Sequence, residues 1–337
     1  MQHVNQQGTT RRTMLRAGAA AGTAAALGAA GLFAAGNGNA ATTARSGKGE
    51  LPCPPGVTDS SHCTPEVAEI FRGVFTAKSE HNLAAFMSYF STASAVYIDA
   101  CLPAVMSGRQ EINSEFSTIF GSAPASAISY PLTIVGDTRS AAIEFVDSPA
   151  FFGQEIRALS SVTFDSNQKI IRWVDYWDGR SSLLQNTFTT YPADFKDSEQ
   201  NADPAVVQAA TRLQAAFAAG NAAAAVALMS ADVVHEDMAA HTRVRGQFQA
   251  QRYYSRALGQ LPYGPGAALV HAEGSSHGGG YEWSAAPGAA PMRRGHTCIE
   301  LDEAGKISRV LAIYDSSLLS YAAYQSLAGL AAEAPLS

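Results

Sequence analysis

The stretch IIRWVDYWDG at residues 170–179 places a carboxylate among aromatic residues. Its β-branched and aromatic content predicts a strand, in which alternate side chains share one face. One apolar face then carries Trp173, Asp175 and Trp177, and the two tryptophans become candidates for contact with a substrate. An unpaired buried carboxylate is costly. Asp175 is therefore either a structural acceptor of hydrogen bonds or a group that exchanges a proton in catalysis.

Two further carboxylates and a tyrosine occur in similar surroundings. Tyr97 and Asp99 lie two residues apart in the strand-like segment SAVYIDA, so their side chains share a face. Asp147 directly follows the segment IEFV. Burial and a neighbouring carboxylate both raise the pKa of a carboxyl group, and carboxyl groups with separated pKa values can serve as acid and base. The alternatives are that Asp99 and Asp147 only form turns and that Tyr97 is a core tyrosine with a satisfied hydroxyl.

The elements that must position these residues occur twice along the chain. Each half begins with two helices, around 65–77 and 82–90 in the first half and around 204–219 and 221–229 in the second. A strand, a third helix and several long strands follow. This order predicts an α+β fold of two tandem domains, each a curved, mostly antiparallel sheet wrapped around about three helices. We expect the domains at 64–190 and 204–332, with a linker at 191–203 and a short apolar helix after 316.

This order of elements resembles the nuclear-transport-factor-2-like fold, in which a curved sheet and helices form a cone-shaped pocket. That superfamily includes ketosteroid isomerases, SnoaL-type polyketide cyclases and limonene-type epoxide hydrolases. The first half is most similar to the epoxide hydrolases. It carries their motifs as YID at 97–99, a proline at 103, GRQEI at 108–112 and WVDYWD at 173–178.

The resemblance implies a role for each polar residue of the first half. Asp175 would be the base that activates water, with Tyr97 helping to hold that water and Asp99 replacing the family's asparagine. Asp147 would be the acid that protonates the opening oxygen. Phe145 stands where the family has an arginine that bridges the two carboxylates, and we expect its ring to contact the substrate instead.

The second half departs from the first at the key position, because Ala312 aligns with Asp175. It keeps a carboxylate in the segment HEDM, which resembles the strand that carries the general base of ketosteroid isomerases; that base would be Asp237. His235 is either a proton carrier beside the pocket or a structural or solvated histidine. The segment VVQAATRLQAAF lacks the tyrosine that such isomerases have on their first helix.

Other classes of site lack a signature in this sequence. The segment HAEGSSHGGGYEW, with His271 and His277, is predicted to be a flexible connection between strands, and it lacks the defined ligand spacing of a metal site. The sequence contains neither a Gly-x-Ser-x-Gly elbow nor a phosphate-binding glycine loop. We therefore expect no cofactor and no metal.

Residues 1–44 are predicted to be an export signal rather than part of the fold. The segment TRRTMLR, with Arg11 and Arg12, resembles the twin-arginine motif, and a run of Ala, Gly and Leu without charge follows Arg16. Cleavage near 40–44 would deliver a secreted or extracytoplasmic bacterial protein without a stable membrane anchor. The alternative is an uncleaved membrane-spanning helix.

The charge of the exported chain excludes one class of partner. Removal of the leader with its three arginines leaves 20 of the 23 basic residues against 29 acidic residues, a net charge of −9. Such a surface repels phosphate backbones, so nucleic acid is not an expected partner.

Cysteine usage agrees with an oxidising compartment. Cys53 and Cys63 bracket the turn-rich segment PPGVTDSSH, and we expect them to form a local disulfide in a linker at 45–63. Cys101 and Cys298 fall within predicted elements and are expected to be buried free thiols.

Two kinds of function remain for the mature chain. The first is an exported, cofactor-independent acid–base enzyme acting on a small apolar molecule of polyketide or terpenoid type. Epoxide opening by hydrolysis or cyclisation is the leading chemistry, and isomerisation or cyclisation next to a carbonyl is the alternative. The second is a non-catalytic protein that binds an apolar ligand. In both, the two domains are candidates to pair with each other.

Overall fold

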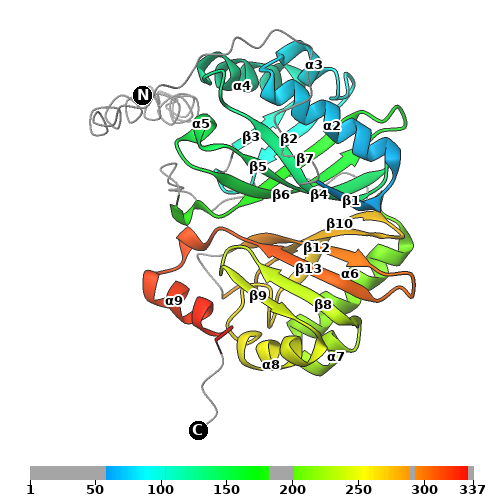
Figure 1. The fold of residues 1–337 in the computed structure, drawn as a ribbon, viewed down its shortest axis with the longest axis vertical. Helices are drawn as coiled ribbons and strands as arrows, with labels where there is room; N and C mark the ends of the chain where they lie inside the picture. The colour runs from blue at the N-terminus through cyan, green and yellow to red at the C-terminus, as the bar shows by residue number, and fades with distance from the viewer. Residues whose placement is uncertain (1–57, 103, 182–200, 289–292, 333–337) are drawn as a thin grey trace, which may run out of the picture.

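The computed structural model describes residues 58–102, 104–181, 201–288 and 293–332. Its layers run from helices through two stacked sheets to helices, with the first half at the top of Figure 1 and the second half below it. The expected signal peptide at 1–44, Cys53, Pro103 and most of the linker at 191–203 lie outside the described residues. No helix of the described residues is long and apolar enough to cross a membrane.

The first half forms a seven-stranded mixed sheet in the order β1-β4-β5-β6-β7-β2-β3. Its elements are β1 (Asp59–Cys63), α2 (Pro65–Ser79), α3 (Leu83–Met87), β2 (Val96–Asp99), β3 (Ala104–Ser107), α4 (Arg109–Ser122), β4 (Ser129–Gly136), β5 (Ser140–Asp147), α5 (Pro149–Phe152), β6 (Ile156–Phe164), β7 (Ile170–Trp177) and the 3₁₀ turn η1 (Gly179–Ser181).

The second half repeats this arrangement without the first strand, in the order β10-β11-β12-β13-β8-β9. Its elements are α6 (Pro204–Ala218), α7 (Ala222–Val226), β8 (Met229–Asp237), β9 (Thr242–Arg245), α8 (Gln247–Ala257), β10 (Ala268–Ser275), β11 (Gly278–Ser284), β12 (Arg294–Leu301), β13 (Ile307–Ile313), η2 (Ser316–Leu318) and α9 (Tyr321–Gly329). The predicted α+β fold with two mostly antiparallel sheets is therefore confirmed.

Strand register confirms the alignment of the two halves. In the first half β2 runs parallel to β7, and Asp99 pairs with Asp175. In the second half β8 runs parallel to β13, and Asp237 pairs with Ala312. The sequence alignment that placed Ala312 at the position of Asp175 is thus also the structural one.

Helix starts follow directly from the local sequence. The side chain of Thr64 accepts a hydrogen bond from the backbone N–H of Val67, and Pro65 occupies the first turn of α2. Asp203 caps α6 in the same way, again followed by a proline. These caps recur at equivalent positions, so the repeat is visible in the signals that begin each helix.

Two predictions about local structure were wrong. Residues 59–63 were expected to be linker, but β1 pairs in parallel with β4, because an edge strand needs backbone partners rather than an apolar face. HAEGSSHGGGYEW was expected to be a flexible connection, but it forms the β10–β11 hairpin. Its glycines permit close approach: a Cβ at Gly279 would lie 2.0 Å from the backbone oxygen of Glu273.

The cysteines of the described chain are free. Cys101 and Cys298 are buried thiols, as predicted. Cys63 is also a free thiol in the structure, and its Sγ donates to the backbone oxygen of Ser60 at 3.3 Å. The expected Cys53–Cys63 disulfide therefore has no support from the described partner.

The two sheets pack face to face through reciprocal ion pairs. Arg172 of β7 contacts Glu282 of β11 at 2.5 Å, and Arg309 of β13 contacts Glu144 of β5 at 3.4 Å. The arginines are equivalent, since each lies three residues before the Asp175 or Ala312 position. The glutamates are equivalent too. Gly136 pairs with Ala141 and Gly274 pairs with Gly279, and in each half the glutamate lies three residues after the partner of that glycine. Such reciprocity is typical of a twofold-symmetric interface.

Candidate active site

Asp175 lies inside the first half and accepts three side-chain hydrogen bonds. Trp173 Nε1 donates to its Oδ1 at 2.5 Å, and Ser160 Oγ donates to the same oxygen. The hydroxyl of Tyr97, on the neighbouring strand β2, donates to Oδ2. The strand alternation predicted from the sequence therefore does bring Trp173 and Asp175 together on one face of β7.

The environment of Asp175 favours its protonated form. Burial raises the pKa of this carboxyl, and the hydrogen bonds from Ser160 and Tyr97 and the charge of Lys78 oppose that effect only in part. A carboxyl with a raised pKa is a better base at neutral pH than an ordinary aspartate.

Asp99 forms a second carboxyl site at the end of β2. Its Oδ1 accepts the backbone N–H groups of Cys101 and Leu102 at 2.9 and 2.8 Å. Trp177 Nε1 lies 3.1 Å from both carboxylate oxygens. Burial raises the pKa of Asp99 to about 7, and the charge of Asp175 adds to the rise, whereas these hydrogen bonds oppose it.

Asp147, at the end of β5, forms a buried ion pair with Lys78 of α2. The distance from Lys78 Nζ to Asp147 Oδ1 is 2.7 Å, and both side chains are almost fully buried. The ammonium also lies 4.8 Å from the ring centre of Phe145, within cation–π range. Asp147 thus has a cationic partner that comes from helix α2.

Sequence reasoning missed Lys78, although a signal was present. Residues Val67, Phe71, Val74 and Phe75 form the buried face of α2. Lys78 follows Val74 by four positions, so it falls on the same face. A charged residue on the apolar face of an amphipathic helix predicts either a buried ion pair or a functional site.

Tyr97 is hydrogen-bonded to Asp175 and lies within electrostatic range of the other two candidate carboxylates. Burial raises the pKa of its hydroxyl, and the negative charges of Asp175, Asp99 and Asp147 raise it further. All three carboxylates therefore lie within electrostatic range of one phenol. The structure joins Tyr97 to Asp175 by a hydrogen bond and Asp99 to Asp175 by strand pairing, whereas Asp147 contacts Lys78 instead.

Aromatic rings form the walls around this group. Trp173 stacks on Tyr97 with ring centres 5.9 Å apart, and it contacts Phe71 and Phe75 edge-on or tilted. Phe145 packs on Phe75 at 5.2 Å. These rings surround the carboxyl groups with apolar material, and low-dielectric surroundings strengthen electrostatic interactions among the charged groups.

The second half has a single carboxylate at the corresponding place. Asp237 accepts the backbone N–H of Ala240 at 2.8 Å and the hydroxyl of Tyr263 at 3.0 Å. Burial raises its pKa to about 7. His235, two residues earlier, shares a 3.0 Å hydrogen bond with Tyr254, and burial lowers its pKa to about 3, which leaves the imidazole neutral at pH 7.

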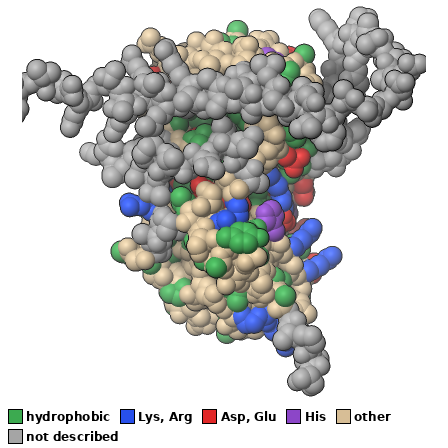
Figure 2. All heavy atoms as spheres, turned by 90° about the vertical axis from the view of Figure 1, so that its left-hand side faces the viewer, with side chains coloured by type: hydrophobic (Ala, Val, Ile, Leu, Met, Phe, Trp, Pro, Cys, Tyr) green, Lys and Arg blue, Asp and Glu red, His purple; other side chains and the backbone are tan. Residues whose placement is uncertain are grey.

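A surface pocket of about 270 Å³ lies apart from both carboxyl sites, beside α9. Its lining includes Leu261, Pro262, Leu319 and Leu327. Figure 2 looks at the side of the molecule that carries α9 and shows basic, acidic and apolar side chains interspersed on the described surface. None of the candidate carboxylates lines this pocket.

Comparison with known proteins yields structural neighbours alone. No family model matches the chain, and neither does any curated protein. An NTF2-like protein of unknown function from Burkholderia xenovorans is 14% identical; the match covers 40% of this chain and 96% of that one, with a TM-score of 0.29. A SnoaL-like protein of unknown function from Burkholderia thailandensis is 15% identical, with coverages of 34% and 98% and a TM-score of 0.30.

A third neighbour is a hypothetical protein with a ketosteroid isomerase-like fold from Catenulispora acidiphila, solved in complex with trimethylamine. It is 20% identical, with coverages of 40% and 99% and a TM-score of 0.30. The fold described above rests on the strand order and register of this chain, and the neighbours assign no residue.

Proposed function

We propose that the interior of the first half is the catalytic site of a cofactor-independent acid–base enzyme acting on a small, largely apolar molecule. One observation carries the proposal: a buried carboxyl, Asp175, is hydrogen-bonded to Tyr97, and the buried Asp147–Lys78 ion pair lies within electrostatic range of these two groups. Asp99 lies beside Asp175 on the neighbouring strand. Acid–base catalysis needs one group that takes up a proton and another that gives one, both held in a site that excludes water.

Opening of an epoxide ring is the reaction that this set of groups supports best. Asp175 takes the proton of a water molecule, or of a hydroxyl within the substrate, as that oxygen attacks a carbon of the ring. The carbon–oxygen bond on that carbon breaks, and the released oxygen takes a proton from the Asp147–Lys78 pair. The proton comes from the ammonium group of Lys78. The carboxylate of Asp147 orients this ammonium group through their ion pair.

The contact with Lys78 supplies what the similarity to epoxide hydrolases lacks. Those enzymes use an arginine between their two carboxylates, and this chain has Phe145 at that position. Here the cation comes from α2, and its charge acts on Asp147 directly and on Asp175 through space. The phenylalanine then has a different task, which is to cover the ammonium with its ring.

A second reaction has its own support in the second half. Asp237 has a pKa of about 7 and a tyrosine hydroxyl at 3.0 Å. A base of that strength beside a phenol suits proton transfer at a carbon next to a carbonyl, as in an isomerase or a polyketide cyclase. A non-catalytic binder of apolar ligands is the remaining alternative.

We also propose that the enzyme works outside the cytoplasmic membrane. The support is the twin-arginine segment TRRTMLR at residues 10–16.

Isotope labelling distinguishes these functions. A panel of small cyclic epoxides and hydroxy-epoxides is incubated with the mature protein in H₂¹⁸O, and products are identified by mass spectrometry. Hydrolysis places one ¹⁸O in a diol, whereas cyclisation consumes the epoxide without label. Carbonyl compounds in D₂O test the isomerase, which exchanges hydrogen next to the carbonyl. Ligand uptake without any product from either panel contradicts the enzymatic proposal and favours the binder.

A further inference from the structure

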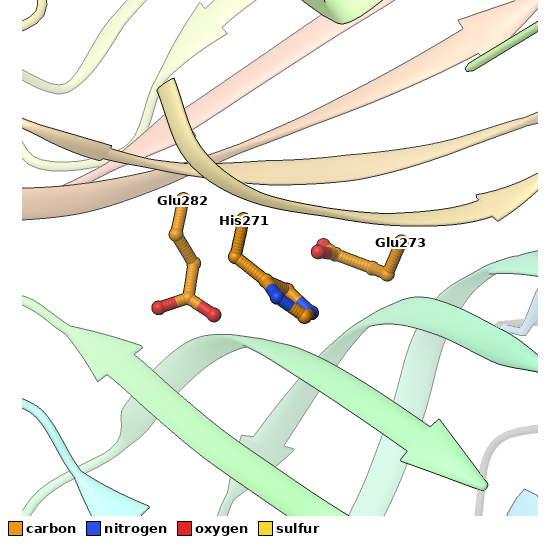
Figure 3. Close-up of side chains that lie close together, drawn as sticks. All are labelled: His271, Glu273 and Glu282. Carbon is orange, nitrogen blue, oxygen red and sulfur yellow. The ribbon is translucent and has the colours of Figure 1, made fainter. Parts of the chain in front are cut away.

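The face of the second sheet that packs against the first carries four buried ionisable side chains. They are His271, Glu273, Glu282 and His296, each at most 1% exposed. Figure 3 shows three of them pointing from their strands toward the strands of the first half, with the imidazole of His271 between the carboxylates of Glu273 and Glu282. None of the four belongs to the carboxyl clusters described above.

Strand register explains how these residues meet. His271 on β10 pairs with Glu282 on β11, which pairs with His296 on β12. Glu273 on β10 pairs with Gly280. A Cβ at Gly280 would lie 2.3 Å from Glu273 Oε1 and 2.6 Å from His296 Nε2, so the glycine is what lets these two side chains touch across the sheet.

One member of the group has no hydrogen-bond partner. Glu282 contacts Arg172 at 2.5 Å and accepts the hydroxyl of Tyr176 at 2.7 Å. Glu273 is paired with His296. In contrast, neither Nδ1 nor Nε2 of His271 has a partner, although the side chain is buried. Such orphaned groups are rare in folded proteins and call for an explanation, such as an ion that the structure does not contain.

At three of these four positions the first half has residues without an ionisable group. By the register of β4, β5 and β6, the equivalents of His271, Glu273 and His296 are Thr133, Val135 and Leu159. The equivalent of Glu282 is Glu144, which likewise forms an ion pair with an arginine of the other half, Arg309. Buried charges do not by themselves stabilise a fold better than apolar residues of similar size. The three ionisable residues of the second half therefore point to a ligand.

We propose that His271, Glu273 and Glu282 bind one divalent transition-metal ion of the Zn²⁺ or Mn²⁺ type between the two sheets. An imidazole nitrogen with two carboxylates is a donor set that such ions accept. The three ligand atoms lie within 4.8 Å of one another. Ligands at about 2.0–2.2 Å from one ion lie roughly 3–4 Å apart, so small side-chain rotations complete the site.

The neighbouring residues fit a supporting role for this ion. Arg172 and Tyr176 hold the carboxylate of Glu282 from the first half, and His296 holds that of Glu273. Hydrogen bonds of this kind orient carboxylate ligands. Because the group is closed to solvent, the ion is structural and links the two halves.

Metal analysis of the full mature chain tests the proposal. The protein is unfolded in denaturant that contains a chelator and is then refolded with or without ZnCl₂ or MnCl₂. After dialysis, the metal bound per chain is measured by elemental mass spectrometry. We expect one equivalent of ion per chain, and a Tm that rises by roughly 5–10 °C when the free ion exceeds Kd about 100-fold. Refolding with Co²⁺ adds a readout of coordination through its visible absorption bands.

Matched variants locate the ion. His271→Thr copies Thr133 and should remove the bound ion, whereas His277→Thr, in the exposed turn of the same hairpin, should retain it. The triple variant His271→Thr, Glu273→Val, His296→Leu copies the first half and covers the case in which the single variant fails to fold. This variant should fold, contain no bound ion and have the same Tm with and without zinc.

Two results would overturn the proposal. One is a refolded wild-type chain that holds no zinc, manganese or cobalt and has the same Tm with and without them. The other is a folded His271→Thr or triple variant that binds as much ion as the wild type.

Discussion

An Asp175→Asn substitution exchanges one carboxylate oxygen for an amide nitrogen at nearly constant volume. The remaining oxygen can still accept the hydrogen bonds of Ser160 and Trp173, while the hydroxyl of Tyr97 must turn from donor to acceptor. Losing the charge weakens each of the three bonds by about 1 kcal/mol, the difference between a charged and a neutral acceptor.

The opposing effect is relief from burial of a charge. Because the pKa of Asp175 is raised despite those bonds, desolvation outweighs them in the folded protein. The free energy of unfolding should therefore fall by no more than about 1 kcal/mol or should increase, and Tm should fall by no more than about 4 °C. Activity should fall by roughly 10²–10⁴-fold, the usual contribution of a positioned general base.

The assay measures both quantities on the same protein. Single-turnover conversion of the best epoxide from the labelled panel gives the rate, and thermal unfolding gives Tm. In the wild type, the rate should fall toward acid pH with an apparent pKa above that of an ordinary aspartate, and this dependence should vanish from the residual activity of Asp175→Asn. Asp237→Asn is the internal control, expected to leave epoxide turnover within about threefold of the wild type.

A purely structural Asp175 gives the opposite pattern. The variant would lose about 1–3 kcal/mol of stability because buried donors lose their acceptor, and the folded fraction would keep its specific activity. A destabilised Asp175→Asn protein with wild-type turnover per folded molecule would refute the catalytic assignment.

Further substitutions test other parts of the argument. Lys78→Met keeps the length of the side chain but removes the ammonium, so it should lower turnover by at least 10-fold and raise the apparent pKa of Asp175 in the rate profile; an unchanged profile contradicts the role of Lys78. The pKa of Asp237 is about 7 in the folded protein, above its ordinary value of 3.8. Its protonation therefore favours the folded state at acid pH, and this stabilisation is lost as the pH rises from about 4 to about 7. Asp237→Asn should thus gain stability relative to the wild type across that range, by up to about 4 kcal/mol, and urea unfolding at pH 4 and pH 8 shows whether the gap widens. Arg11→Lys with Arg12→Lys should leave the precursor in the cytoplasm, and normal secretion of that variant, seen by fractionation, contradicts the twin-arginine assignment.

The local sequence was sufficient to predict the helices and most strands, and to predict which side chains of β7 share a face. Thr64 with Pro65, and Asp203 with Pro204, mark helix starts through capping, which depends on near neighbours only. Alternation in β7 placed Trp173 and Asp175 on one face for the same reason, since the period of a strand is a local property. The repeat followed because both halves carry the same order of such signals.

Local rules misjudged two segments, one because it is rich in glycine and one because its partner strand is distant. The glycines of HAEGSSHGGGYEW suggested flexibility, but Gly279 and Gly280 sit where other backbone and side-chain atoms approach too closely for a Cβ. The polar segment Asp59–Cys63 became a strand because β4 offered it an edge. β4 is remote from this segment in the sequence, whereas β10 and β11 are consecutive strands.

What the sequence determined about this protein is therefore the content of each half: its helices, its strands, and which carboxylates share a face with aromatic residues. The tertiary structure alone decided which charges meet. It joined Lys78 to Asp147 across 69 positions of chain, paired each half's arginine with the other half's glutamate, and set His271 between two carboxylates in a dry interface. Electrostatic interaction depends on distance and burial, and both are fixed only when segments remote in sequence pack together.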